Sequence, residues 1–233
     1  DVYKRPVWGF GAGARAIGDP PPEAELEALR ARVGYDHLAI DTTAGTALKA
    51  VPALEIDLSA IAKGFGVDQA SAALLGTGFD DHLVEVGGEI RAVGEREGGG
   101  GWRLAIEQPD SDGRAIHAVV ELSELAMATS GDYRSFHEAG GRRLAHIIDP
   151  RTGAPVGHGV ASVTVLHERA AAADAWATAL MVLGAEEGAA IAERHDIAAY
   201  WIERTPEGEY ATRASTSFPS LRQARPAQAA AEE

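Results

Sequence analysis

The residues best suited to chemistry lie in one short segment, residues 146–155. His146 and an apolar pair lead into an Asp149-Pro turn that is followed by Arg151 and Thr152. Histidine is a base that titrates near neutral pH, and arginine is a cation that binds phosphate oxygens. A lone strand histidine is more often structural, but this density of polar types predicts a site for proton transfer beside a phosphate.

A second pair, Asp174 and Thr178, stands in an alanine-rich stretch. A helix would place both side chains on one face, because residues four apart lie one above the other. Carboxylate and hydroxyl oxygens are ligands that Mg²⁺ accepts while it keeps positions for a substrate phosphate. In the alternative, Asp174 caps the helix and Thr178 bonds to its own backbone. From these residues alone, neither interpretation is favoured.

Two further segments join a strand end to a helix or a turn. In residues 55–68, Lys63, two glycines and backbone N–H groups could hold a phosphate or an adenosine hydroxyl. Alone, the segment favours a plain capped helix with Lys63 in solvent. Residues 128–133 carry three hydroxyl side chains around Gly131 and alone indicate an ordinary polar turn.

These segments lie within a pattern of helices and strands. Helical spacing predicts helices at 23–33, 59–75, 170–183 and 186–195. Strand patterns occur at 37–41, 54–57, 83–86, 102–107, 116–122, 125–129, 144–148, 160–166 and 197–202. The glycine-rich link 95–101 predicts a hairpin connection rather than a domain boundary. We therefore predict an α+β fold with helices packed on an antiparallel sheet.

Composition narrows the function classes. The 233 residues are 45% hydrophobic, which is typical of one compact unit. Their formal charge of −14 argues against nucleic acid as a partner. The absence of cysteine excludes disulfides and thiolate chemistry. The sequence predicts no membrane span and no leader in residues 1–10. We reject a loose dinucleotide-binding pattern at 11–16, because no strand precedes it.

Five segments in this order resemble the ApbE family of FAD:protein FMN transferases, over residues 8 to about 218. They are IDLSAIAKG (56–64), VEVGGEIR (84–91), TSGDY (129–133), HIIDPRTG (146–153) and ADAWAT (173–178). The resemblance implies an ApbE-like, T-fold-related domain over residues 1–221. The composition of residues 222–233, rich in Ala, Gln and Glu, predicts a disordered tail. Family members begin with a further segment that covers the flavin, so we expect the domain to be incomplete at its N-terminus.

The resemblance also implies an activity. FMN would pass from FAD to a Thr or Ser hydroxyl of a target protein, with Mg²⁺ at the pyrophosphate and AMP released. The metal ligands of the family correspond to Asp174, Thr178 and the Ala60 carbonyl, its base to His146, and its flavin-nucleotide contacts to Asp57, Lys63 and Ile148. Some members carry a second acid where this chain has Ala177, which implies a looser metal shell.

Partners and location follow from the same resemblance. The acceptor would be a flavoprotein subunit of a membrane redox complex, and the protein would be a membrane-associated lipoprotein on the periplasmic side of the bacterial inner membrane. Three alternatives stay open. One is an FAD pyrophosphatase, in which water attacks and free FMN results. The others are a carrier that holds FAD without turnover, and a folded but inert domain.

Overall fold

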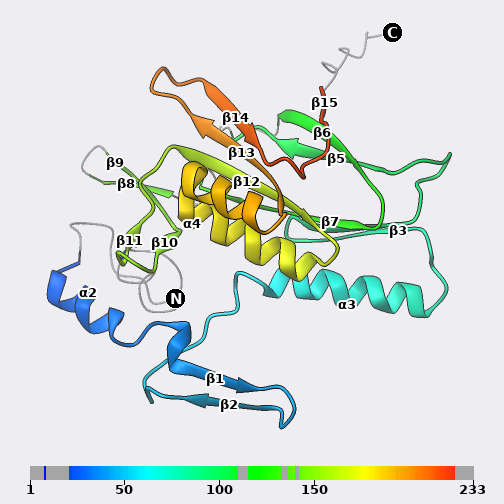
Figure 1. Ribbon diagram of the computed structural model, residues 1–233. Coiled ribbons are helices and arrows are strands. Elements are labelled where there is room, and N and C mark those ends of the chain that lie inside the picture. Colours follow the sequence, from blue (N-terminus) through cyan, green and yellow to red (C-terminus); the bar gives the residue numbers. More distant parts are fainter. Residues whose placement is uncertain (1–7, 9–20, 110–114, 133–135, 140–141, 224–233) are drawn as a thin grey trace. The chain divides into compact units, whose positions relative to one another are not determined.

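The computed structural model describes residue 8 and residues 21–109, 115–132, 136–139 and 142–223 (Figure 1). The chain forms two compact units. The first comprises residues 1–60 and 132–159, and the second comprises residues 61–131 and 160–233. The second unit is therefore interrupted in sequence by part of the first. The predicted domain of residues 1–221 includes all of the first unit and the second unit except residues 222–233, and its boundary stays a prediction.

A six-stranded sheet forms the centre of the second unit. Its order is β14-β13-β12-β7-β4-β3, and every neighbouring pair is antiparallel. The strands are β3 (His82–Val86), β4 (Glu89–Val93), β7 (Leu125–Gly131), β12 (Val160–His167), β13 (Ala198–Arg204) and β14 (Tyr210–Ala214). Nearly all of β12 is buried, as expected of a central strand that is covered on both faces.

Helices cover one face of this sheet. They are α3 (Ala62–Gly76) and α4 (Ala170–Arg194), coloured cyan and yellow to orange in Figure 1. Val67 of α3 and Ala170 of α4 pack against Ala126 of β7, so both helices lie on the same side. Small residues such as Ala126 allow the helix backbones to approach the sheet closely.

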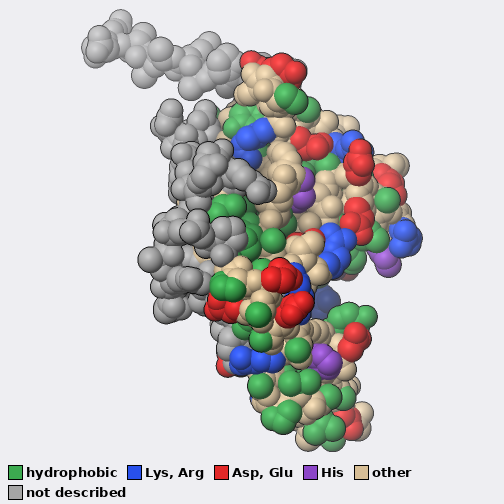
Figure 2. Space-filling model, turned by 90° about the vertical axis from the view of Figure 1, so that its left-hand side faces the viewer, with side chains coloured by type: hydrophobic (Ala, Val, Ile, Leu, Met, Phe, Trp, Pro, Cys, Tyr) green, Lys and Arg blue, Asp and Glu red, His purple; other side chains and the backbone are tan. Residues whose placement is uncertain are grey.

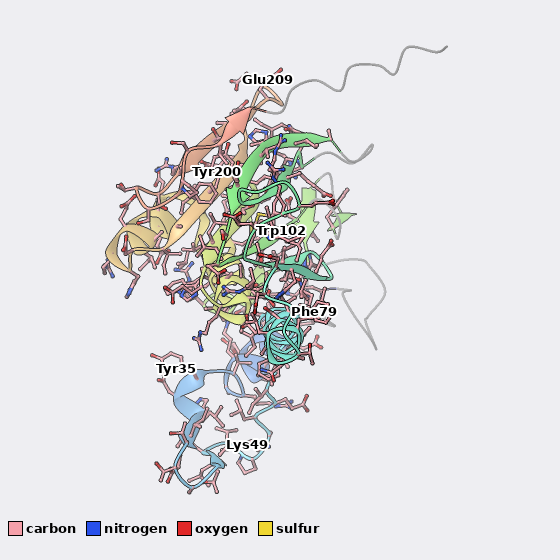
Figure 3. All side chains as sticks on the ribbon, turned by 90° about the vertical axis from the view of Figure 1, so that its right-hand side faces the viewer. Tyr35, Lys49, Phe79, Trp102, Tyr200 and Glu209 are labelled. Carbon is pink, nitrogen blue, oxygen red and sulfur yellow. The ribbon has the colours of Figure 1, made fainter. Side chains whose placement is uncertain are left out.

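A three-stranded sheet packs on the opposite face. It contains β5 (Trp102–Glu107), β6 (Ile116–Leu122) and β15 (Arg222–Gln223), in the order β15-β6-β5. Its inward side chains share one core with those of the six-stranded sheet: Leu104, Ile106, Val120, Met127, Leu166, Tyr200 and Ile202. Trp102 and Tyr200 are labelled in Figure 3. The second unit is thus three layers, helices on a sheet on a second sheet.

The first unit consists of short elements. These are α2 (Glu23–Arg30), the 3₁₀ turn η1 (Tyr35–His37), and three hairpins, β1 (Leu38–Asp41) with β2 (Thr46–Lys49), β8 (Phe136–Ala139) with β9 (Arg142–Ala145), and β10 (Ile148–Asp149) with β11 (Ala154–Pro155). The Arg30 guanidinium of α2 donates to the Thr152 carbonyl, and the Trp8 indole donates to the Gly153 carbonyl at 2.9 Å. These bonds tie α2 and Trp8 to the turn between β10 and β11.

The α+β prediction with an antiparallel sheet is confirmed. The bounds predicted for β5 and β6 agree with the structure, and the two helices predicted between residues 170 and 195 form α4, which is broken at Gly184 (φ 79°, ψ −179°). The helix predicted from residue 59 begins at Ala62. Among the described residues, no helix has both the length and the apolar character that crossing a membrane needs.

Three sequence predictions are wrong. Residues 54–57 form no strand, because β1 pairs with β2 and the Asp57 carboxylate instead accepts the Ser59 N–H at 2.8 Å. The link 95–101 is no hairpin, since it joins β4 of one sheet to β5 of the other. The strand predicted at 144–148 is divided between β9 and β10.

The end of the chain is only partly described. The predicted tail starts at residue 222, but Arg222 and Gln223 pair with β6 as β15. Residues 224–233 lie outside the described residues.

Acidic and basic side chains are interspersed over the described part of the face in Figure 2.

Candidate active site

The N-terminal turns of α3 and α4 meet at Asp174. This side chain is 4% exposed, and its Oδ2 accepts the backbone N–H of Gly64 at 3.1 Å. Gly64 lies in the first turn of α3, where N–H groups have no partner within the helix. A Cβ atom at Gly64 would lie 2.2 Å from the Ala170 carbonyl oxygen. Only glycine therefore lets the two helices approach closely enough for this bond.

A second carboxylate makes the reverse contact. Asp68 of α3 accepts the N–H groups of Ala170 and Ala171, at 2.7 and 3.0 Å. Each helix therefore supplies a carboxylate that caps the N-terminus of the other. The expectation that Asp174 might cap its own helix is wrong, because Asp68 fills that position and Asp174 caps α3.

Thr178 lies one turn further along α4. Its Oγ1 is 3.2 Å from the Oγ of Ser130, near the end of β7. This bond replaces the predicted alternative in which Thr178 bonds to its own backbone. The neighbouring Thr129 pairs instead with Thr164 at 2.9 Å. Ser130 belongs to the segment 128–133, and it faces the α4 residue that was predicted as a metal ligand.

Lys63 is not free in solvent. Its ammonium forms an ion pair with Oε1 of Glu89, whose side chain is 2% exposed while that of Lys63 is 43% exposed. Burial raises the pKa of Glu89; the Lys63 hydrogen bond and charge oppose this, and the Asp174 charge adds to it. Among the described residues, Oε2 of Glu89 has no hydrogen-bond partner.

Sequence reasoning assigned no role to Glu89. The available signal was its position directly after Gly87 and Gly88, within the segment 84–91. Both glycines have positive φ, 62° and 101°, and they form the tight turn of the β3–β4 hairpin. Glu89 is therefore the first residue of β4, held by the hairpin register against Val86.

The donor set around Asp174 fits Mg²⁺. Burial raises the pKa of Asp174, while the Gly64 N–H and the Lys63 charge oppose that shift. With Glu89 and Asp174 both ionised, two buried carboxylates face one lysine, and a cation would offset the excess negative charge. The described residues contain no group of three His, Cys, Asp or Glu side chains suited to a metal. One carboxylate and one hydroxyl leave positions for substrate oxygens and water.

The remaining predicted residues belong to the first unit. His146 is half-buried between β9 and β10, and Ile148 is buried in β10 opposite Pro155. Asp57 and Ala60 are half-buried, and Ala60 is the last residue of this unit before α3. Lys63, Asp174 and Thr178 are together in the second unit. The roles assigned to these residues stay predictions.

Arg151, the cation predicted to meet phosphate, binds Asp149. Its Nε and Nη2 donate to the Asp149 carboxylate at 3.1 and 3.0 Å, and its N–H donates at 2.8 Å. Partial burial acts to raise the pKa of Asp149, but these Arg151 bonds outweigh burial and lower it. The guanidinium charge is thus already compensated locally.

Comparison with known proteins identifies the family. The sequence profile of the ApbE family matches residues 4–201. This chain belongs to the ApbE family. The crystal structure of the flavinyl transferase ApbE from Pseudomonas stutzeri, 40% identical, superposes with a TM-score of 0.81 over 93% of this chain and 66% of that chain. The ApbE-like architecture predicted for the fold is confirmed.

Two curated relatives of this ApbE-family chain are named FAD:protein FMN transferase. The protein from Haemophilus influenzae is 44% identical over 227 residues, which are 95% of this chain and 65% of the relative. The protein from Vibrio cholerae is 46% identical, over 91% of this chain and 62% of the relative. The chain thus spans slightly less than two thirds of either relative's length.

Proposed function

We propose that the protein transfers FMN from FAD to a Thr or Ser hydroxyl of an acceptor protein and releases AMP. The relatives' shared name supports this activity. The observation that carries it is the buried Asp174 carboxylate, held at the N-terminus of α3 and one helical turn from Thr178. The carboxylate and hydroxyl oxygens suit a hard cation such as Mg²⁺, which accompanies phosphates.

Mg²⁺ would be held by the Asp174 carboxylate, the Thr178 hydroxyl and the Ala60 carbonyl. When bound, it neutralises pyrophosphate charge and makes the phosphorus a better electrophile. The chain's own groups supply the rest. Lys63 brings a cation to the phosphates, and Asp57 and Ile148 contact the nucleotide.

His146 is the base in this proposal. The acceptor hydroxyl gives its proton to His146 while its oxygen attacks the phosphorus on the FMN side. The bond from that phosphorus to the bridging oxygen breaks, and AMP leaves with that oxygen. A positioned base of this kind contributes about 10²–10⁴-fold to the rate.

Family membership alone supports the proposed partner and location. The acceptor would be a flavoprotein subunit of a membrane redox complex, on the periplasmic side of the bacterial inner membrane. Fractionation of cells that produce the protein, with an antibody to this chain, tests the location. Recovery in the cytoplasmic fraction would contradict it.

The decisive experiment measures FMN transfer by mass spectrometry. The purified protein is incubated with FAD, Mg²⁺ and an acceptor domain that carries a candidate threonine. Asp174→Asn keeps the side-chain shape but removes the metal-binding charge, so we expect transfer to fall by on the order of 100-fold or more. Glu27→Gln, at an exposed position of α2, is the matched control and should transfer normally.

Each alternative function predicts a different result in this experiment. AMP without labelled acceptor would favour the pyrophosphatase, and FAD binding without AMP would favour the carrier. His146→Ala separates these further, because the enzyme needs this base for AMP release while a carrier does not. Normal AMP release by His146→Ala would remove His146 from the mechanism.

A further inference from the structure

Glu89 is a buried carboxylate that the proposed mechanism does not use. Its side chain is 2% exposed, and Oε1 pairs with the Lys63 ammonium. The other oxygen, Oε2, is buried without a hydrogen-bond partner among the described residues. A buried charge with an unsatisfied oxygen destabilises a fold unless another gain offsets it.

The surroundings of Lys63 are shaped to hold its side chain. A Cβ atom at Gly87 would lie 3.1 Å from Cδ of Lys63, so the glycine makes room for the lysine stem. Glu89 follows the same turn and reaches the ammonium at the end of that stem. The β3–β4 hairpin thus contacts both the methylene chain and the charge of Lys63.

The Lys63 side chain lies beside the candidate site, so the position of its ammonium affects that site. It stands next to Gly64, whose N–H binds Asp174, and its charge acts on Asp174. A lysine with a free four-carbon stem would sample many positions, and fixing it before the substrate binds reduces the entropy lost on binding.

We propose that Glu89 is a positioning residue that holds the Lys63 ammonium at the N-terminus of α3, ready for the phosphates of FAD. The inference rests on the proposed function, because it takes FAD as the ligand of Lys63. Glu89 itself contacts Lys63 rather than substrate. Its role is to decrease the freedom of Lys63 and to fix the direction of its charge.

A purely structural ion pair would behave differently. If Glu89 only stabilised the fold, Glu89→Gln would lower the melting temperature and leave FAD affinity unchanged. The burial of Glu89 opposes its ionised form, and Lys63 is exposed enough to be solvated alone. We therefore expect Glu89→Gln to melt at the wild-type temperature or above it.

The test combines FAD binding with kinetics. Glu89→Gln should raise the KM and Kd for FAD about 10-fold, as for the loss of a charged hydrogen-bonding group, with kcat within about 2-fold. Lys63→Met should weaken FAD binding at least as much, because it removes the charge that Glu89 positions. The double variant should lose no more FAD affinity than Lys63→Met alone, because Glu89 acts through Lys63. Glu203→Gln, in the β13–β14 ion pair with Arg213, is the matched control.

Two results would overturn the inference. One is wild-type FAD affinity in Glu89→Gln. The other is a change in the Mg²⁺ concentration needed for activity with FAD affinity unchanged, since Glu89 would then act through Asp174. If the wild-type protein binds no FAD, the proposed function fails, and amine labelling decides whether Glu89 holds Lys63.

Labelling needs no FAD. Lys63 is one of three lysines in the sequence, and peptide mapping separates it from Lys49, whose ammonium donates to the Leu54 carbonyl at 3.0 Å. Without its carboxylate partner, Lys63 should react several-fold faster with an acylating reagent, while Lys49 is unchanged. Equal labelling of Lys63 in the wild type and in Glu89→Gln would show that Glu89 does not hold it.

Discussion

The absence of a side chain at Gly64 allows α3 to bind Asp174. Gly64→Ala would place a Cβ atom 2.2 Å from the backbone oxygen of Ala170, which cannot rotate away. We expect α3 and α4 to move apart, with a loss of about 1–3 kcal/mol of unfolding free energy and reduced FMN transfer. Gly66→Ala is the control, because its Cβ would meet nothing within 4 Å and alanine favours a helix. Chemical denaturation compares the two, and equal stabilities would contradict the close contact.

The environment of His117 predicts that the stability of the protein depends on pH. Its Nδ1 bonds to Gln108 Oε1 at 2.7 Å and its Nε2 to the Tyr200 hydroxyl at 3.0 Å, and burial lowers its pKa. The folded state therefore holds His117 neutral at pH values where the unfolded chain, with a pKa of about 6.5, is already protonated. Its contribution is complete above that value and is lost as pH falls toward the folded-state pKa. The stability advantage of wild type over His117→Gln should shrink as pH falls below about 6.5, as melting curves would show; an advantage that stays constant would contradict this prediction.

The helices α3 and α4 are held together by caps, because each supplies a carboxylate to the N-terminus of the other. Asp68→Ala removes the acceptor of the Ala170 and Ala171 N–H groups, which should lower the unfolding free energy by about 0.5–2 kcal/mol. Because α4 carries Asp174, we also expect a higher Mg²⁺ requirement for FMN transfer. Asp68→Asn keeps one acceptor oxygen and should lie between Asp68→Ala and wild type in denaturation and in Mg²⁺ titration. If Asp68→Ala keeps both properties of the wild type, the cap does not position Asp174.

The elements also show what sequence could predict. Periodicity located α4 and most strands, because 3.6- and 2-residue repeats record which face is buried. It placed a strand at 54–57, where the apolar residues have no partner strand. The exchanged caps could not be predicted, since they join residues about 100 positions apart, such as Asp68 and Ala170. Likewise the ion pair of Glu89 could not be predicted, because its partner Lys63 belongs to another element.

In the whole molecule, the candidate residues are divided between the two units. Residues 132–159 of the first unit are inserted between β7 and β12, which pair directly in the sheet of the second. The motifs and their order were visible in the sequence, and so was the family. The division was not, because composition shows no boundary at residues 132 and 159. The tests of the proposed FAD binding therefore use all 233 residues rather than either unit alone.

Thermal unfolding of the 233-residue chain with FAD and Mg²⁺ tests whether it binds both ligands. A ligand that binds only the folded state adds about 2.7 kcal/mol at 100 times its Kd. For a chain of this length, that corresponds to a rise of roughly 5–10 °C in Tm. We expect the full rise only with both ligands, since in the proposed function the Asp174 and Thr178 oxygens would hold the Mg²⁺ that accompanies the pyrophosphate. Asp174→Asn should lose the part of the rise that depends on Mg²⁺ and keep the part caused by FAD alone. A shift in Asp174→Asn that still grows with Mg²⁺ as in wild type would place the metal elsewhere in the protein.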